Sequence, residues 1–115
     1  MEFLRRLKLR CIWSWAGVVA TWTSEHSFRS WVWANLVSGA VALILPLSPG
    51  ERALILALGI LILAAELLNT AIEDAVDYIS TEDHPLAKRA KDAGSAGVAV
   101  AAIAAGVAWV VILIG

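Results

Sequence analysis

The chain has 115 residues, enough for one domain, but 60% of them are hydrophobic, which is too large a share for an ordinary soluble domain. The formal net charge is -1 at pH 7, and the basic residues form no stripe with interleaved aromatic side chains, so a nucleic-acid-binding protein is not expected. Cys11 is the only cysteine, which excludes an intrachain disulfide and a Cys-x-x-Cys metal site. The composition therefore indicates a membrane protein.

The N-terminal segment, about residues 3–23, is predicted to be an amphipathic surface helix. Its basic residues lie mostly off the apolar stripe, and it contains several Trp residues. These features are typical of a helix that lies in the membrane interface with its charges toward the headgroup phosphates. A helix packed on a soluble partner is the weaker alternative, because the rest of the chain is so hydrophobic. The apolar residues recur at spacings of three and four and are Leu4, Leu7, Cys11, Trp15, Val18 and Trp22.

A polar stretch at residues 23–27 interrupts the apolar pattern and predicts a bend before the next helix. Glu25 is the only acid in residues 3–50, and it precedes the first long apolar run, so it is expected near the membrane interface. Taken alone, Glu25 reads as an acid in the first turn of a helix. Taken together with Glu73, it is a candidate metal ligand.

Three apolar segments are predicted to cross the membrane as helices. The second helix should continue in water to about Thr81, and the third should begin at Pro85, since proline is tolerated in a first turn. We therefore expect one domain over residues 1–115, an all-α membrane protein with one surface helix and three transmembrane helices. The predicted spans are about residues 29–47, 53–73 and 93–114.

Small residues recur every four positions in the third span, for example at Ala93, Gly97, Ala101 and Ala105, which is typical of helices that approach closely in lipid. Three spans enclose little interior, so other copies of the chain are expected to complete a helical bundle in a homo-oligomer. Basic residues gather in the N-terminal segment and in the loop between the second and third spans. Both regions are therefore predicted to be cytoplasmic.

A polar stripe on the second helix is the strongest indication of a site. An ionisable side chain at membrane depth costs about 2.5–3.5 kcal/mol, so Glu66, next to the apolar run, is a site candidate. A structural carboxylate, paired with Lys91 or capped by Asn69, is the alternative. An ion pair needs only two groups, however, and a second polar motif begins at Lys91 and Asp92. At about 100° per residue, one helix face presents all five residues of the polar stripe, namely Glu66, Asn69, Thr70, Glu73 and Asp77.

These residue types suit phosphoryl transfer at the membrane. Glu25 and Glu73, with Asp77 as a further candidate, offer hard oxygen ligands for Mg²⁺, and Lys91 offers a positive charge for phosphate. Glu66 is placed to receive a hydroxyl proton. No Walker motif or kinase glycine-rich loop occurs, so a nucleotide site of the soluble type is excluded. The depth of Glu66 suggests that the hydroxyl comes from a lipid.

At these residues the sequence resembles the prokaryotic diacylglycerol kinase family of small membrane kinases. Residues 65–73 (AELLNTAIE) and 91–96 (KDAGSA) look like its two motifs, and thinner similarity covers nearly the whole chain. The resemblance implies a homotrimer of three-span subunits in the bacterial cytoplasmic (inner) membrane, with the N-terminus and active site on the cytoplasmic side. It also implies transfer of the γ-phosphate of MgATP to the hydroxyl of diacylglycerol, giving phosphatidic acid.

The family's functional residues map by motif position. Glu66 would be the catalytic base. The implied magnesium ligands are Glu25 and Glu73. The residues implied to hold the nucleotide are Arg6, Trp13, Glu25, Asn69, Glu73, Asp77, Glu82, His84, Lys91 and Asp92. Those implied to contact the lipid substrate are Arg6, Glu66 and Ser95. Two positions depart from the pattern near the headgroup, where Trp31 replaces a second acid and Ala16 replaces a Lys.

Three alternatives stay open at this point. The family includes undecaprenol kinases, and residues 84–88 (HPLAK) look closer to that branch, whereas residues 94–96 look closer to the diacylglycerol branch. A membrane kinase that acts on a soluble substrate is a weaker alternative. A non-enzymatic membrane protein whose polar stripe merely assembles an oligomer is the rival from another class, and ATP consumption that depends on a lipid alcohol would separate the two.

Overall fold

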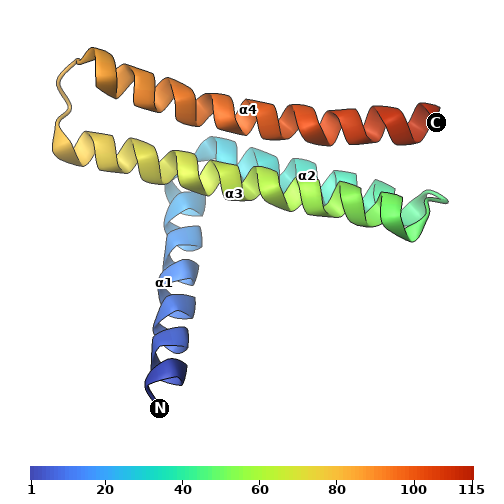
Figure 1. Cartoon of the computed structure of the whole chain (residues 1–115), viewed down its shortest axis with the longest axis horizontal. Coiled ribbons are helices and arrows are strands. Elements are labelled where there is room, and N and C mark those ends of the chain that lie inside the picture. Colours follow the sequence, from blue (N-terminus) through green and yellow to red (C-terminus); the bar gives the residue numbers. More distant parts are fainter.

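A computed structural model of the chain describes residues 1–115 and contains only α-helices, in agreement with the predicted all-α class. Figure 1 shows α2, α3 and α4 lying side by side as a bundle, while α1 projects away from it. The N-terminus therefore lies far from the bundle, and the C-terminus lies at the end of the bundle opposite to the loop that joins α3 and α4. The four helices are α1 (Glu2–Ser24), α2 (His26–Ile44), α3 (Pro49–Ile79) and α4 (Pro85–Ile114).

The connection between α2 and α3 is tight. α2 ends at Ile44, earlier than the predicted end at 47, because Pro46 forces the residue before it into an extended conformation; Leu45 has φ -69° and ψ 150°. Arg52 of α3 then donates to the carbonyl oxygens of Ala42 at 2.9 Å and of Leu45 at 3.2 Å. These bonds satisfy carbonyls that the end of α2 leaves without a helical partner.

The starts of α3 and α4 are capped by side chains. At α3, the Ser48 side chain accepts a hydrogen bond from the Glu51 N–H at 3.2 Å, and the Glu51 carboxylate accepts one from the Ser48 N–H at 2.8 Å. α4 begins at Pro85, the residue at which the sequence predicted a helix start. Its N-cap is His84, whose Nδ1 accepts from the Leu86 N–H at 3.1 Å.

The joint between α1 and α2 consists of a single extended residue, Glu25, with φ -114° and ψ 108°. It lies within the bend predicted at residues 23–27. Arg29 stabilises the joint, because its guanidinium donates to the carbonyl oxygen of Thr23 at 3.2 Å and to that of Trp22. The last carbonyls of α1 are thus tied to the first turn of α2, which fixes where Glu25 lies.

α3 lies in the middle and approaches both neighbouring helices closely. Gly59 of α3 faces the side-chain amide of Asn35 on α2, and Gly94 of α4 faces that of Asn69 on α3. A Cβ atom at either glycine would collide with the amide oxygen, so a larger residue there would force the asparagine side chain to move. The second contact brings the start of α4 against the polar stripe.

α4 keeps part of its small-residue pattern free. It is joined to α2 by a hydrogen bond from Trp109 Nε1 to Ser38 Oγ at 2.9 Å. Gly97 and Gly106 have no neighbouring atom within 4 Å of a Cβ built on them. The spacing that suits close helix packing is therefore only partly used within one chain.

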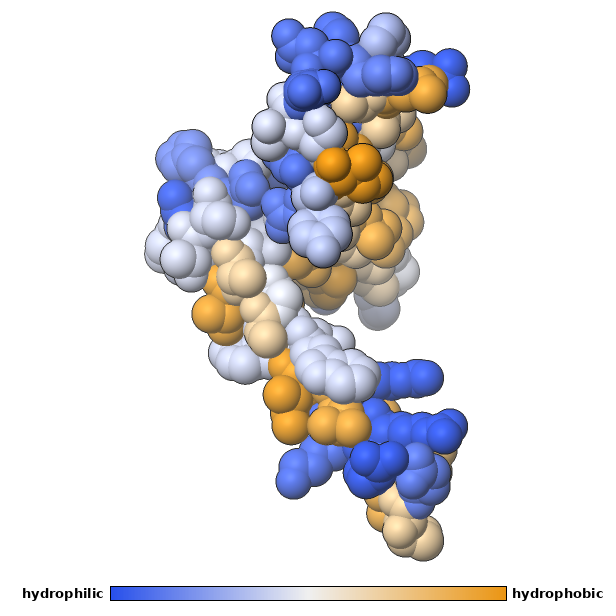
Figure 2. Space-filling view, turned by 90° about the vertical axis from the view of Figure 1, so that its left-hand side faces the viewer, coloured by the Kyte–Doolittle hydropathy of each residue, from blue (hydrophilic) through white to orange (hydrophobic).

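The exposed surface is that of a membrane protein. Only 10 of 115 residues are buried, too few for a soluble core. α3 and α4 are long and apolar enough to cross a membrane, and only 28% and 11% of these apolar stretches are buried, unlike core helices of soluble proteins. α2 does not reach the same level. Figure 2 shows hydrophilic residues at the end where α3 and α4 join and at the start of α1, with hydrophobic surface exposed between them.

Candidate active site

The deepest residue of the polar stripe is buried against α2. Glu66 is only 4% exposed, and Thr70, one turn further along α3, is also buried. Ser27 of α2 donates a hydrogen bond from Oγ to Oε2 of Glu66 at 3.2 Å. No ion pair involves Glu66, so the carboxylate is neither neutralised by Lys91 nor bound by Asn69. The structure therefore leaves a buried carboxylate with a single hydroxyl partner.

The next turn of α3 links Asn69 to Glu73. Asn69 donates from Nδ2 to Oε1 of Glu73 at 3.1 Å, and its Oδ1 lies against Gly94 as the one buried side-chain polar atom without a partner. Leaving a buried acceptor unpaired costs free energy, and natural structures tolerate it mainly where the group has a function. Asn69 therefore orients Glu73 and offers an unused oxygen toward α4.

Lys91 and Asp77 close the outer end of the stripe. Nζ of Lys91 lies 2.6 Å from Oδ1 of Asp77, which pairs α4 with α3. The hydrogen bond to Asp77 raises the pKa of Lys91, so this side chain is a fixed positive charge at neutral pH. Both side chains stay partly open to solvent, with 39% and 50% of their surface exposed, so the ammonium can also contact a ligand.

Glu25 lies among further acids. Its partial burial raises its pKa, and the negative charges of Glu73, Asp74 and Glu66 raise it further, against a smaller opposing effect of Arg29. None of the four acids forms an ion pair within the chain. The bend between α1 and α2 and the face of α3 thus gather negative charge that the protein itself leaves uncompensated.

This excess of negative charge suits a divalent cation. The chain contains no ready-made group of three or more His, Cys, Asp or Glu ligands. Mg²⁺ does not require one, because it usually keeps several waters and binds one or two carboxylates together with substrate phosphates. Glu25 and Glu73 have oxygen ligands of the right kind, and their repulsion would be relieved by a cation. The donor types of Glu25 and Glu73 are therefore of the kind that magnesium accepts.

A hollow of about 690 Å³ lies beside the loop between α3 and α4. It brings together four residues that the sequence assigned to the nucleotide, namely Asp77, Glu82, His84 and Lys91. Its size is within the range of small-molecule sites. Lys91 lines this hollow and also pairs with the polar stripe, so the hollow and the stripe form one continuous region.

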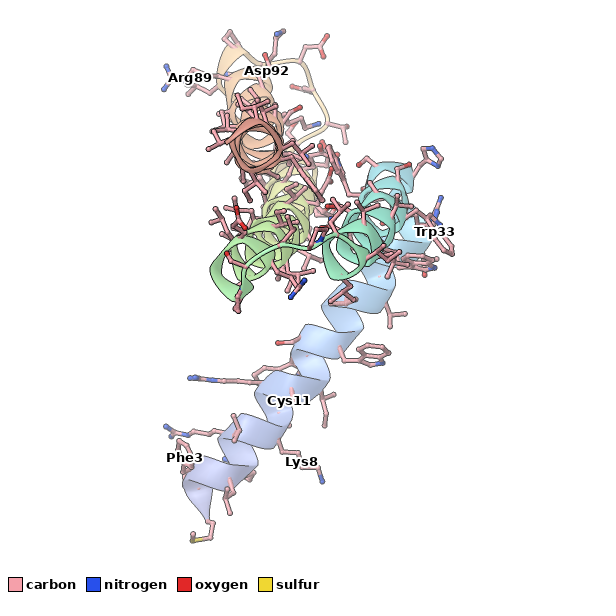
Figure 3. The ribbon with its side chains drawn as sticks, turned by 90° about the vertical axis from the view of Figure 1, so that its right-hand side faces the viewer. Phe3, Lys8, Cys11, Trp33, Arg89 and Asp92 are labelled. Carbon is pink, nitrogen blue, oxygen red and sulfur yellow. The ribbon has the colours of Figure 1, made fainter.

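Other predicted residues lie elsewhere in a single chain. Arg6 is paired with Glu2 at 2.9 Å and Trp13 is 63% exposed, both on the part of α1 that leaves the bundle (Figure 1). Asp92 pairs with Lys88 at 2.6 Å, and Figure 3 shows Asp92 on the side of α4 that faces away from α3. Ser95 is exposed on α4, next to Gly94. One chain thus assembles only part of the predicted residue set.

Two residues near Glu66 and Glu73 were missed in the sequence. In the sequence, Ser27 stands only as part of the polar stretch at residues 23–27, since nothing in its local pattern indicates a partner 39 residues away. Asp74 lies about 80° from Glu66 around α3, just outside the polar stripe, and that angle was the available signal. Its charge acts on Glu25.

Comparisons with known proteins show the family of this chain. The family model described as prokaryotic diacylglycerol kinase matches residues 12–113. A relative from Pseudomonas aeruginosa named diacylglycerol kinase is 46% identical over 112 residues, covering 97% of this chain and 91% of the relative. The protein of that name from Escherichia coli K12 is 40% identical over 100 residues, covering 87% and 82%. The one from Haemophilus influenzae is 36% identical over 97 residues, covering 84% and 82%. The chain belongs to the prokaryotic diacylglycerol kinase family.

Proposed function

We propose that the chain is an ATP-dependent diacylglycerol kinase, which transfers the γ-phosphate of MgATP to the hydroxyl of diacylglycerol and gives phosphatidic acid. The observation that carries this proposal is the buried carboxylate of Glu66, which lies where the apolar part of α3 meets a group of uncompensated acids and a fixed lysine. A lipid alcohol approaching along α3 reaches Glu66 before it reaches water. The names of the relatives give the acceptor as diacylglycerol.

Glu66 acts as the general base. As the lipid oxygen attacks the γ-phosphorus, the hydroxyl proton passes to the carboxylate, and the bond from the γ-phosphorus to the bridging oxygen of ATP breaks. A carboxylate with little access to water keeps its proton-accepting oxygen for the substrate rather than for solvent. Thr70, buried one turn away, shapes the same wall of α3.

The nucleotide is held further out. Lys91 places its charge on the phosphates, and Asp77 orients Lys91 through the 2.6 Å ion pair. Glu82 and His84 line the hollow that takes the rest of the nucleotide. Glu25 and Glu73 would hold Mg²⁺, with Asn69 orienting Glu73. The cation, when bound, supplies positive charge that neutralises the phosphate oxygens during transfer.

We further propose that three copies assemble in the bacterial cytoplasmic membrane, each with spans about residues 29–47, 53–73 and 93–114 and with α1 on the membrane surface. α2 then is the third span, although it is less apolar than α3 and α4. The open faces at Gly97 and Gly106 support packing between copies. The positions of Arg6, Trp13, Asp92 and Ser95 support sites completed by a neighbouring copy, with the nucleotide on the cytoplasmic side.

Undecaprenol is the second candidate acceptor, favoured by residues 84–88 at the start of α4. Purified protein in detergent micelles should be given ATP labelled at the γ-phosphate with diacylglycerol, with undecaprenol or with no lipid. We expect labelled phosphatidic acid and little labelled polyprenyl phosphate. Faster labelling of undecaprenol would show that undecaprenol, rather than diacylglycerol, is the acceptor. No transfer to any lipid alcohol would favour the oligomeric membrane protein without catalytic activity.

A further inference from the structure

Ser27 is the second residue of α2 and the single hydrogen-bond partner of the Glu66 carboxylate. We propose that Ser27 is a positioning residue: its hydroxyl holds Oε2 of Glu66 so that Oε1 faces the substrate hydroxyl. This inference rests on the proposed function, because it presupposes that Glu66 takes a proton. It adds a residue from α2 to a site otherwise built from α3, α4 and the bend at Glu25.

The two oxygens of Glu66 differ in their surroundings. Oε2 accepts from Ser27 at 3.2 Å, whereas no donor reaches Oε1. An ionised carboxylate only accepts hydrogen bonds, so Ser27 must be the donor. One oxygen is occupied and the other is free for a proton.

A hydroxyl is needed because the end of a glutamate side chain is poorly fixed by packing. The terminal torsion of Glu has broad preferences rather than sharp rotamer wells. A hydrogen bond to one oxygen selects the orientation of the carboxylate plane and hence the direction of the other oxygen. The distance of 3.2 Å is longer than a typical hydroxyl–carboxylate bond, and such bonds in unliganded sites shorten in the reacting complex.

Ser27 is exposed, but the turn of α2 that carries it is anchored by its neighbours. Phe28, the next residue, is 3% exposed and anchors the first turn of α2 in the core. Arg29 ties the same turn to the end of α1. The hydroxyl therefore comes from a helix fixed on two sides, which is the kind of support that precise positioning requires.

Four variants test the proposal: Ser27→Ala, Ser27→Cys, Ser27→Thr and, as the matched control, Ser30→Ala. Ser30 lies three residues further along α2, is exposed, and hydrogen-bonds only to His26 at 3.5 Å. The measurements are kcat, the KM values for ATP and for a short-chain diacylglycerol, and the half-saturating Mg²⁺ concentration. Folding is checked by the thermal midpoint of each purified variant.

We expect kcat to fall about 10- to 100-fold in Ser27→Ala, the range for losing a hydrogen bond to a charged group. Ser27→Cys keeps the volume but is a weak donor, so its kcat should fall similarly. Ser27→Thr keeps the hydroxyl and should stay within about threefold of wild type. Both KM values and the Mg²⁺ requirement should change by less than about twofold, and Ser30→Ala should match wild type. In a Glu66→Gln background, Ser27→Ala should cause no further loss.

Several results would overturn the proposal. A wild-type kcat in Ser27→Ala or Ser27→Cys would show that the hydroxyl does nothing for Glu66. A loss in Ser27→Thr as large as in Ser27→Ala would assign the effect to packing. A change confined to KM or to the Mg²⁺ requirement would show that Ser27 supports Glu25 and the cation rather than Glu66. If the wild-type protein phosphorylates no lipid, the proposed function fails and this inference fails with it, whereas an active wild type with unaffected Ser27 variants removes the inference alone.

Discussion

Lys91 and Asp77 form the single ion pair that joins two different helices of this chain, with 2.6 Å between Nζ and Oδ1. The other three ion pairs lie within α1 or within α4. Exposed pairs of this kind contribute little to stability, because water and salt screen the charges. The pair lies where the polar stripe meets the hollow beside the α3–α4 loop, so its main effect is to place a positive charge at the nucleotide.

Lys91→Ala should therefore affect ATP far more than folding. We expect kcat/KM for ATP to fall at least about 100-fold, because a charged contact to the phosphates is lost, while the thermal midpoint shifts by no more than about 4 °C. Lys91→Arg keeps the charge and should retain part of the activity. Arg89→Ala is the matched control, since Arg89 is exposed at the start of α4, forms no ion pair and does not line the hollow. Equal losses in Lys91→Ala and Arg89→Ala would contradict a specific role for Lys91.

Glu66→Gln should leave the protein folded and able to bind nucleotide but nearly inactive. The amide keeps the shape of the side chain and can still contact Ser27, but it cannot accept a proton. Loss of a general base typically lowers the rate about 100- to 10,000-fold. Steady-state rates and nucleotide binding should be measured on the same preparation. More than about a tenth of the wild-type rate would show that Glu66 is structural.

Glu25→Gln should stabilise the protein when no divalent cation is present. Burial and the charges of Glu73, Asp74 and Glu66 raise the pKa of Glu25 in the folded state. Its contribution to stability is thus fully present below the unfolded pKa of about 4.3 and is lost as pH rises through the folded pKa. At pH 7 with a chelator, the neutral amide should raise the thermal midpoint by at least about 1 °C. This advantage should shrink as the pH falls toward 4.

Magnesium should reverse the order of thermal stability of the wild type and Glu25→Gln. The wild type should gain more thermal stability from Mg²⁺ than Glu25→Gln or Glu73→Gln does, because a ligand that binds the folded state more tightly stabilises it more at the same concentration. Half-saturating Mg²⁺ for catalysis should also rise in both variants. Unchanged requirements in both would exclude them as ligands and point to Asp77.

The sequence predicted most of what depends on local pattern. The helical period alone placed Glu66, Asn69, Glu73 and Asp77 on one face, and the tolerance of a first turn for proline gave the start of α4. The helix α2 ends at Ile44, three residues before the predicted end of the span at 47, because Pro46 forces Leu45 into an extended conformation. These outcomes follow from interactions within a few residues.

Pairing between distant residues could not be predicted in the same way. The contact of Ser27 with Glu66 spans 39 residues and depends on how the bend at Glu25 directs α2 along α3. The contact of Gly94 with Asn69 depends on the rotation of α4 about its axis. No period in one helix specifies its angle to another, so these neighbours appear only in three dimensions.

The last prediction concerns sites shared between copies. Glu25 lies close enough to Glu66 for their charges to interact, whereas Arg6 lies on the part of α1 that leaves its own bundle. Mixing Glu66→Gln chains with Arg6→Ala chains should therefore restore activity, because some sites combine Glu66 from one copy with Arg6 from another. With random mixing in equal amounts, about a quarter of such sites would be intact.

Mixing Glu66→Gln chains with Glu25→Ala chains should restore no activity, since both substitutions fall in the group of residues that one chain supplies. If the first mixture stays inactive although crosslinking shows that the chains mix, each copy has its own complete site; if the second mixture recovers, Glu25 acts on a neighbour.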